Sequence, residues 1–191
     1  SIGALSITGD GQLDLGSHNL ILRTAEAPSL TTRLDVQAIL QAGYSGGSWS
    51  GTGGIMSSAV GFNVSQGRPG RSIGWGVAGE VLGFVAGSVS WRGTTVQPGN
   101  ILISFTMAGD ANLDRTVGFD DLLVVAQNYE SSEVRFWNTG NFDYDIDHRT
   151  NFSDLLIVAQ NYGQSLMQSM LIVSLRRSST RASTVTHDVL A

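Results

Sequence analysis

The sequence predicts an α+β fold in two parts: a β-rich module with one helix over residues 1–107, then an all-α pair of loop-and-helix units over residues 108–163. In the first part, short apolar alternations lie between Gly- and Ser-rich turns, a pattern typical of β-strands. In the second part, one segment occurs twice, and each copy runs from an acidic loop into an apolar pattern of helical period. Residues 164–191 form a short apolar run and a Ser/Thr/Arg tail, for which we expect disorder.

The elements of the first part follow from apolar spacing and helix signals. Alternating apolar residues predict strands within residues 13–22 and 101–107. One helix is expected between them, with Thr32 as N-cap, residues 34–40 as its body and Gly43 as its terminator. The first part is therefore expected to act as a β-rich spacer or support module.

Residues 73–91 are almost continuously apolar, so a membrane helix has to be considered as well as buried strands. Gly79, Gly83 and Gly87 recur at the four-residue spacing of small residues in packed membrane helices. Glu80 near the centre and the many glycines favour two buried strands joined by a turn. We expect no membrane span here.

The same stretch contains Gly74-x-Gly76-x-x-Gly79, which matches the glycine pattern of dinucleotide-binding turns. That pattern binds a pyrophosphate only between a strand and a helix, with an acidic residue about twenty positions later. Because no Asp or Glu occurs between Val81 and Ala108, we do not expect a nucleotide site.

The repeated segments place oxygen-bearing side chains at loop positions one, three, five and twelve, which is the spacing of a Ca²⁺ loop. A chain that coils around a hard cation turns alternate residues inward, and a carboxylate on the first helical turn closes the coordination shell. In the first loop the expected ligands are Asp110, Asn112, Asp114, the carbonyl of Thr116, a water beside Gly118, and Asp121. In the second loop they are Asp143, Asp145, Asp147, the carbonyl of Arg149, Asn151 and Asp154.

Both loops depart from the usual pattern at position six, where glycine is normal and this chain has Arg115 and His148. A left-handed backbone at a residue other than glycine costs about 1–2 kcal/mol, so weakened sites are expected. The second loop has an alternative register that begins at Asn141. We prefer the register from Asp143, because it aligns Asp154 with Asp121 at position twelve.

Acidic turns that cap two helices need no metal, and this is the competing interpretation. Duplication argues against it, because the position-twelve residues lie thirty-three residues apart and the same apolar pattern follows each. Eight of the twelve Asp lie between Asp110 and Asp154, so the net charge of −5 is concentrated where a cation is expected.

Residues 109–163 resemble the type I dockerin repeat, in its variant from large secreted proteins of planctomycete-like bacteria. Residues 1–107 are similar to a segment that often precedes such repeats. The resemblance implies two bound Ca²⁺ ions, an extracellular or cell-surface location, and attachment to a cohesin-like or cell-surface protein in polysaccharide-degrading machinery. Because the chain begins at Ser1, we expect the export signal to lie upstream.

In dockerin-type modules the partner is recognised by loop positions ten and eleven and by the helix surface that follows. The matching residues here are Phe119, Asp120, Gln127, Asn128, Phe152, Ser153, Gln160 and Asn161. Phe119 and Phe152 could instead pack inward, because large aromatic side chains favour cores. The polar Gln-Asn pairs would then carry the docking surface.

Composition limits the remaining function classes. Charged residues make up 14% of the chain, which does not suit a nucleic-acid binder, and the absence of Cys excludes disulfides and thiol catalysis. The three His are scattered and no catalytic constellation is visible, so we expect no enzyme. A degraded hydrolase fragment is disfavoured, because no paired acids occur outside the loops.

A carbohydrate-binding β module with structural calcium loops is the alternative function. Trp49, Trp75, Trp91 and Trp137 could stack against sugar rings. Core packing is the commoner use of Trp in a small β module, and polysaccharide remains a possible partner under this alternative.

Overall fold

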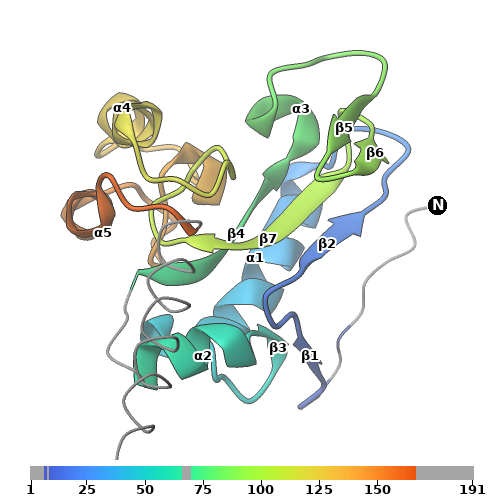
Figure 1. The fold of residues 1–191 in the computed structure, drawn as a ribbon. Coiled ribbons are helices and arrows are strands. Elements are labelled where there is room, and N and C mark those ends of the chain that lie inside the picture. The colour runs from blue at the N-terminus through green and yellow to red at the C-terminus, as the bar shows by residue number, and fades with distance from the viewer. Residues whose placement is uncertain (1–6, 8, 66–69, 167–191) are drawn as a thin grey trace, which may run out of the picture.

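The structure is a computed structural model, and it describes residue 7, residues 9–65 and residues 70–166 (Figure 1). These residues form five α-helices, two 3-10 helices and seven strands in three sheets. The strands are β1 (Gln12–Asp14), β2 (Asn19–Leu22), β3 (Gly54–Met56), β4 (Arg71–Val77), β5 (Val89–Trp91), β6 (Thr94–Val96) and β7 (Ile101–Met107). The helices are α1 (Leu30–Tyr44), η1 (Ser45–Gly47), α2 (Ser58–Ser65), α3 (Ala78–Val81), α4 (Phe119–Asn128), η2 (Trp137–Thr139) and α5 (Phe152–Asn161). The predicted tail beyond Leu166 lies outside the described residues.

The predicted fold class, with a one-helix β module followed by a separate all-α pair, is wrong. The described chain has a mixed α and β architecture, with three α-helices before residue 107. Helix α2 gives little sequence signal, because it is short, lies among Gly and Ser residues, and buries only Val60. The loop-and-helix units do not stand apart as an all-α layer, because residues 136–144 pack against β4.

Strand β7 is the centre of a three-stranded antiparallel sheet in the order β2-β7-β4. All seven of its residues are buried, and it has the bounds that the apolar run 101–107 predicts. Trp75 in β4 points to α1, where its Nε1 donates to Gln37 Oε1 at 2.9 Å. Gly74 and Gly76 alternate with Trp75, and they face the segment around Trp137. The sheet therefore has α1 on one face and the second loop-and-helix unit on the other.

Helix α1 confirms the helix predicted before residue 43, with shifted ends. The helix begins one turn earlier than predicted. Its N-cap is Ser29, whose side-chain oxygen accepts a hydrogen bond from Thr32 N. Gly43 lies in the last turn rather than after it. A Cβ there would overlap the carbonyl group of Ile55, so this glycine allows β3 to approach the helix.

Strand β4 is the first of the two buried strands predicted for residues 73–91. The second strand, β5, is only partly buried and pairs with β6, and the four-residue helix α3 stands where a turn was expected. Among residues 7, 9–65 and 70–166, no helix is long and apolar enough to cross a membrane. Beside the central sheet lie a parallel pair, β1 with β3, and a hairpin of β5 with β6.

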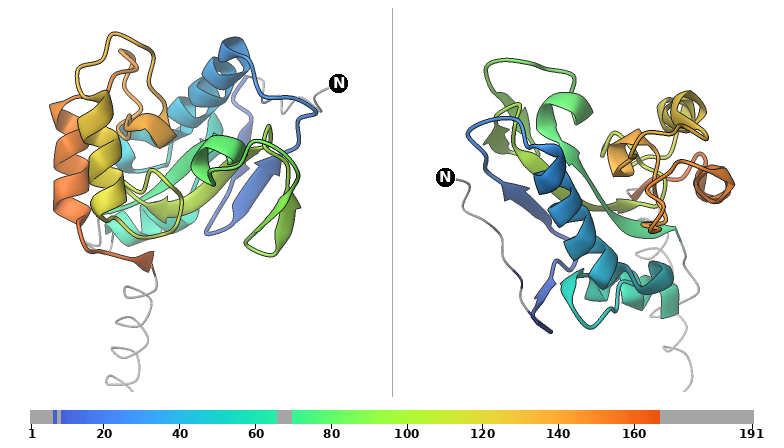
Figure 2. Two further views of the ribbon diagram at one scale, coloured as in Figure 1. Left: turned by 90° about the horizontal axis from the view of Figure 1, so that it is seen from above. Right: turned by 180° about the vertical axis from the view of Figure 1, so that it is seen from behind.

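The two halves of the chain share one hydrophobic core. The ring of Tyr144 lies 5.2 Å from that of Tyr44 and 5.3 Å from that of Trp49. Its hydroxyl donates to Ile73 O at 2.7 Å, and its carbonyl oxygen accepts from Gln41 Nε2 at 2.8 Å. Helices α4 and α5 lie side by side at one end of the molecule (Figure 2). The entry to the second loop is thus anchored on the first half of the chain.

Candidate metal centre

Helices α4 and α5 begin in the same way, because each has a carboxylate at its third residue. Asp121 Oδ2 accepts from Gly118 N at 2.8 Å, and Asp154 Oδ2 accepts from Asn151 N at 2.9 Å. These carboxylates cap the helices and also reach back to the loops, where Asp121 Oδ1 accepts from Ala111 N at 2.7 Å. In the second unit Asp154 Oδ1 accepts from Phe142 N at 2.6 Å. Each helix therefore closes its preceding loop with one buried carboxylate.

The first loop is built around Asp110, whose side chain is 0% exposed. Its carboxylate accepts hydrogen bonds from Arg115 N at 2.8 Å, from Asp114 N at 3.1 Å and from the hydroxyl of Thr106. These donors are neutral, and Thr106 belongs to the buried strand β7. The loop backbone thus wraps around a buried negative charge.

The other predicted ligands of the first loop lie nearer the surface. Asn112 Oδ1 accepts from Asp114 N at 2.9 Å, and Asp114 Oδ1 accepts from Thr116 N at 2.7 Å. Asp114 and Thr116 are exposed, whereas Asn112 is half-buried. These side chains form a series of tight turns that leaves carboxylate and amide oxygens on the outer side of the loop.

In the second loop, the predicted ligands are also linked through backbone N–H groups. Asp154 Oδ1 accepts from Asp143 N at 3.3 Å, and Asp143 Oδ1 accepts from Asp145 N at 3.3 Å. Asn151 Nδ2 donates to Asp145 Oδ2 at 3.4 Å. The remaining two residues, Asp147 and Arg149, are exposed, and Arg149 N donates to Asp147 Oδ1 at 2.8 Å.

The first half of the second loop follows the register from Asn141, and its second half follows the preferred register from Asp143. Asn141 and Asp110 are both fully buried, and each follows a glycine with positive φ. The residue after each donates its N–H to the helix carboxylate, as described above for Ala111 and Phe142. Three residues further, Leu113 and Tyr144 both have positive φ, at 58° and 54°. Later in the loop, Arg149 N donates to Asp147 Oδ1 as Thr116 N donates to Asp114 Oδ1, so the two extra residues of the second loop lie between its two halves.

Burial raises the pKa values of the loop carboxyls. The pKa of Asp110 rises to about 7, mainly by burial, although hydrogen bonds from Thr106 and Arg115 N oppose the rise. Burial also raises the pKa of Asp154 to about 7 and that of Asp145 to about 6. The pKa values of Asp121 and Asp143 are raised by the same cause. A cation bound beside these groups would favour their ionised forms at neutral pH.

Within the described ranges, the ion pairs Arg33–Glu80 and Arg135–Glu133 do not involve any loop carboxylate. In those ranges no three His, Asp or Glu side chains converge as a ready cluster for a metal. The donor set is made of carboxylate, carboxamide and backbone oxygens, which suits a hard cation such as Ca²⁺. One of these oxygens, Asn141 Oδ1, is buried without a hydrogen-bond donor. The oxygen ligands that the loops offer therefore fit calcium. In this structure the carboxylates accept hydrogen bonds from backbone N–H groups.

Position six of both loops has the left-handed backbone that the sequence predicts. Arg115 has φ 77° and His148 has φ 50°. Arg115 Nε and His148 Nδ1 are buried without hydrogen-bond partners among the described residues. The strain expected from the missing glycine is therefore present in each loop.

Each loop pairs with the segment that follows the helix of the other unit. Val117 N donates to Gln164 O at 3.0 Å, and Gly163 N donates to Val117 O at 2.8 Å. In the same way Glu130 N donates to Thr150 O at 2.8 Å. Because each unit contacts the other in the same way, the two units are related by a near two-fold repetition. These hydrogen bonds also connect each loop to the other unit.

Phe119 and Phe152 are 66% and 65% exposed, so their packing into the core, the interpretation that we favoured, is wrong. Leu123 and Leu156 are also exposed, one turn further along each helix. Of the other predicted partner-binding residues, four are exposed: Asp120, Ser153, Gln127 and Gln160. Asn128 and Asn161 are half-buried, and each Nδ2 donates to a carbonyl oxygen of its own helix, that of Val124 or Ile157.

The four Trp residues are buried and form no sugar-binding platform. Trp49 and Trp137 are fully enclosed, and Trp49 Nε1 donates to Ser72 Oγ at 3.0 Å. Gly74 admits the Trp137 ring, since a Cβ at Gly74 would lie 2.5 Å from Trp137 Nε1. The glycine pattern in β4 therefore allows close packing, and α3 after it has only four residues.

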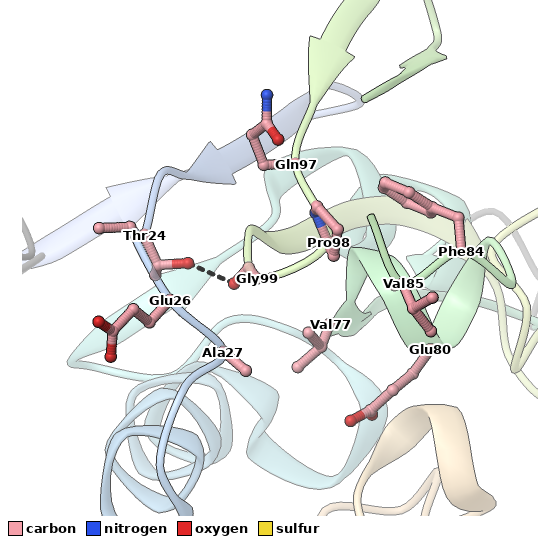
Figure 3. Close-up of a pocket in the computed structure, with 12 residues that line it drawn as sticks. Thr24, Glu26, Ala27, Val77, Glu80, Phe84, Val85, Gln97, Pro98 and Gly99 are labelled. Carbon is pink, nitrogen blue, oxygen red and sulfur yellow. Dashed lines mark hydrogen bonds between the residues drawn. The ribbon is translucent and has the colours of Figure 1, made fainter. Parts of the chain in front are cut away.

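A cavity of about 610 Å³ lies at the end of β4, between residues 24–27, α3 and residues 97–99 (Figure 3). Apolar groups such as Phe84 and Pro98 line most of it. Thr24 donates its hydroxyl to Gly99 O, and Glu80 is paired with Arg33. These contacts are structural, and the cavity lies apart from the two loops.

Sequence reasoning considered Asn141 only as the start of a register that it did not prefer, and it missed Thr106 as a member of the site. The signal for Asn141 was the preceding glycine, because Gly109-Asp110 and Gly140-Asn141 align from the start of each loop. No signal marked Thr106, which reaches Asp110 because β7 ends beside the loop. No family model matches the chain, and no curated protein and no solved structure proved similar to it.

Proposed function

We propose that the chain is a non-catalytic, calcium-binding docking or architectural module that binds two Ca²⁺ ions, one in each loop. The observation that carries the proposal is the burial of Asp110, Asp121 and Asp154 beside neutral donors only. Arg92 interacts electrostatically with Asp110, but it donates its hydrogen bonds to Asn19, Ser104 and Leu113 O. A buried carboxylate without an ion-pair partner is destabilising. A bound cation would offset this destabilisation, and the remaining oxygens of the loop would coordinate it as well.

In the first loop the ion would be held by Asp110, Asn112, Asp114, the carbonyl of Thr116 and Asp121. Thr106 would keep Asp110 oriented through its hydroxyl. Calcium supplies positive charge and cross-links the loop to α4. The chain itself supplies a rigid support, because Asp110 O accepts from the buried Trp137 Nε1 at 2.6 Å.

We further propose that α4 and α5 present the docking surface. It consists of Phe119, Leu123, Phe152 and Leu156, and we call it the Phe-Leu face. Exposed aromatic and aliphatic residues at matching places on two helices suit a partner with an apolar groove. The Gln127 and Gln160 side chains lie near the far ends of the same helices and are exposed. Asn128 and Asn161 are less suited, because their amides bond to their own helices.

The resemblance to dockerin repeats supports a cohesin-like or cell-surface partner, an extracellular location and a role in polysaccharide degradation. These remain parts of the proposal. The carbohydrate-binding alternative loses its main support, because the four Trp side chains are buried.

Calcium titration of the whole chain by isothermal calorimetry tests the proposal. Two ions are expected to bind, and circular dichroism and thermal denaturation should show greater helicity or stability with Ca²⁺ than with a chelator. Ligand binding to the native state alone stabilises by about 2.7 kcal/mol at a hundredfold excess over Kd. Heats and melting curves that do not differ between calcium and chelator would reject the calcium assignment.

Asp121→Asn and Asp154→Asn should each weaken one site, because each variant loses the charge that closes a loop. Asp120→Asn is the matched control, because Asp120 is the exposed neighbour of Asp121 and has the same side chain. Equal calcium affinities for Asp121→Asn and Asp120→Asn would contradict the assignment of Asp121.

A further inference from the structure

The carbonyl oxygen of Asn141 is buried and lacks a donor. The side chain is 0% exposed, and within the described residues no hydrogen-bond partner reaches Oδ1. Its Nδ2 donates at 3.4 Å to Asp145 Oδ1, so the carboxamide lies against a carboxylate of the second loop. A carbonyl oxygen without a donor is costly inside a protein, and it is also a ligand that Ca²⁺ accepts readily.

Three carboxylates surround the same stretch of backbone. Asp154 Oδ1 accepts from both Phe142 N and Asp143 N, and Asp145 N donates to Asp143 Oδ1. Asp154 is fully buried, while Asp143 and Asp145 are partly so. The unpaired carbonyl of Asn141 therefore stands beside a concentration of negative charge, where a cation would satisfy both.

The place of Asn141 matches that of Asp110 in burial, in the preceding glycine and in the hydrogen bond that follows it. We propose that Asn141 Oδ1 is the first ligand of the cation in the second loop, together with Asp143, Asp145 and Asp154. This inference rests on the proposed calcium function, and it replaces the ligand set that the spacing alone suggested.

The extra length of the second loop lets Asn141 and Asp154 take the places of Asp110 and Asp121. The loop runs from Asn141 to Asp154, whereas the first runs from Asp110 to Asp121, two residues fewer. Ile146 is 86% exposed, so the surplus length projects into solvent. Asp147 accepts from Arg149 N at 2.8 Å, as Asp114 accepts from Thr116 N, so the loop regains the spacing of the first loop after the insertion.

The two sites are therefore not equivalent. The first has a charged carboxylate, Asp110, at its buried end, and the second has a neutral carboxamide there. Because affinity for Ca²⁺ depends on the number of charged ligands and on the rigidity of the site, the second loop should gain affinity from a charge at Asn141.

Calorimetric titration of the whole chain with CaCl₂ distinguishes the two ligand sets. Even the loss of a residue that supports a ligand lowers metal affinity by about 10- to 100-fold, so Asn141→Leu should weaken one of two sites by at least about tenfold. Asp120→Asn, at an exposed residue of α4 that is a ligand in neither set, should leave both affinities unchanged. Two unchanged affinities in a folded Asn141→Leu variant would overturn the inference in favour of the Asp143 register.

Asn141→Asp is a second variant, chosen because Asp has nearly the same side-chain shape as Asn and should not disturb the fold. It should bind calcium more tightly than the natural chain and be less stable in chelator, since a buried charge then lacks its cation. Unchanged affinity in Asn141→Asp together with unchanged affinity in Asn141→Leu would also overturn the inference.

Asp110→Asn separates this inference from the proposed function. If the natural chain binds no calcium, the proposed function fails. If it binds one ion that Asp110→Asn removes and Asn141→Leu does not affect, calcium binding by the first loop stands and the second site fails. In a two-dimensional NMR spectrum, the Asn141 side-chain amide signals should move on calcium addition in the natural chain and in Asp110→Asn.

Discussion

The indole Nε1 of Trp137 donates a hydrogen bond of 2.6 Å to the carbonyl oxygen of Asp110. Trp137 belongs to the segment that enters the second loop, and Asp110 is the first residue of the first loop. The Trp137 ring also contacts Phe142 at 5.0 Å and Tyr144 at 5.6 Å between centroids. One side chain therefore connects the two loops and the sheet beneath them.

Trp137→Phe should lower the free energy of unfolding and weaken calcium binding in the first loop. The variant leaves a buried carbonyl oxygen without its donor, which costs about 1–3 kcal/mol, and it also loses ring volume. Urea denaturation in calcium would measure the change. Val85→Ala is the control, because Val85 is almost fully exposed and should change the stability by less than about 0.5 kcal/mol. Equal stabilities of the two variants would contradict a structural role for the bond.

Without calcium, stability should fall as the pH rises from acid to neutral. Burial raises the folded-state pKa of Asp110 from the ordinary value of 3.8 to about 7, and that of Asp154 also to about 7. Between these values the folded state holds more protons than the unfolded state, so the free energy of unfolding decreases with pH. Saturating calcium requires the ionised carboxylates and should abolish or reverse this slope.

Thermal denaturation at about pH 5 and about pH 8, in chelator and in calcium, measures the effect. The expected result in chelator is a lower Tm at the higher pH. A Tm in chelator that rises from the lower to the higher pH would show that these carboxyls do not control stability. The comparison needs buffers with low metal affinity at both values.

The sequence predicts a helix or strand of this fold well where the signal lies within that element's own residues. The apolar run of β7 is a local signal, and the strand has the predicted bounds. The repeats are local as well, and α4 and α5 each begin after an acidic loop with the position-twelve carboxylate in the first turn, as predicted. The pairing of β1 with β3 and the contact of Tyr144 with Ile73 are not local, because they join segments distant in the chain. The mixed architecture follows from such contacts.

The candidate site shows the same limit. Ligand spacing pointed to both loops, but a register counted from Asp154 fits only the second half of the second loop, because two extra residues lie around Ile146. Only the backbone hydrogen bonds, from Ala111 N and from Phe142 N, show which residues correspond. The exposure of Phe119 also depends on the helix packing rather than on residue type.

Glu130→Gly should stabilise the protein by about 0.5–1 kcal/mol. Glu130 has φ 52° directly after Tyr129, and the equivalent residue after Tyr162 is Gly163, with φ 74°. Glycine removes the cost of the left-handed backbone at this place. Gly163→Ala is the reciprocal variant and should destabilise, although a Cβ there would meet no atom within 4 Å. Chemical denaturation of both variants tests the pair, and changes of equal sign would contradict the argument.

Replacing Phe119 and Phe152 together by Ser should abolish partner binding and leave folding and calcium binding intact. Both rings are largely exposed, so their loss removes little buried area from the folded chain. If the Phe-Leu face docks into an apolar groove, the same rings would become buried in the complex and would carry much of its affinity. Calorimetric titration with purified type I cohesin domains measures binding, and circular dichroism with a calcium titration confirms that the variant is folded.

Gln127→Ala with Gln160→Ala is the matched control, because these side chains are exposed on the same two helices but lie away from the Phe residues in sequence. Loss of binding in the Gln pair with full binding in the Phe pair would move the docking surface to the far ends of α4 and α5. If the natural chain binds no cohesin domain at all, the partner class is wrong, while the calcium titration still decides the metal sites. Normal partner binding by the Phe119→Ser and Phe152→Ser double variant would show that the partner contacts a different surface. Loss of folding is not the expected cause of lost binding, because both rings are largely exposed in the folded chain.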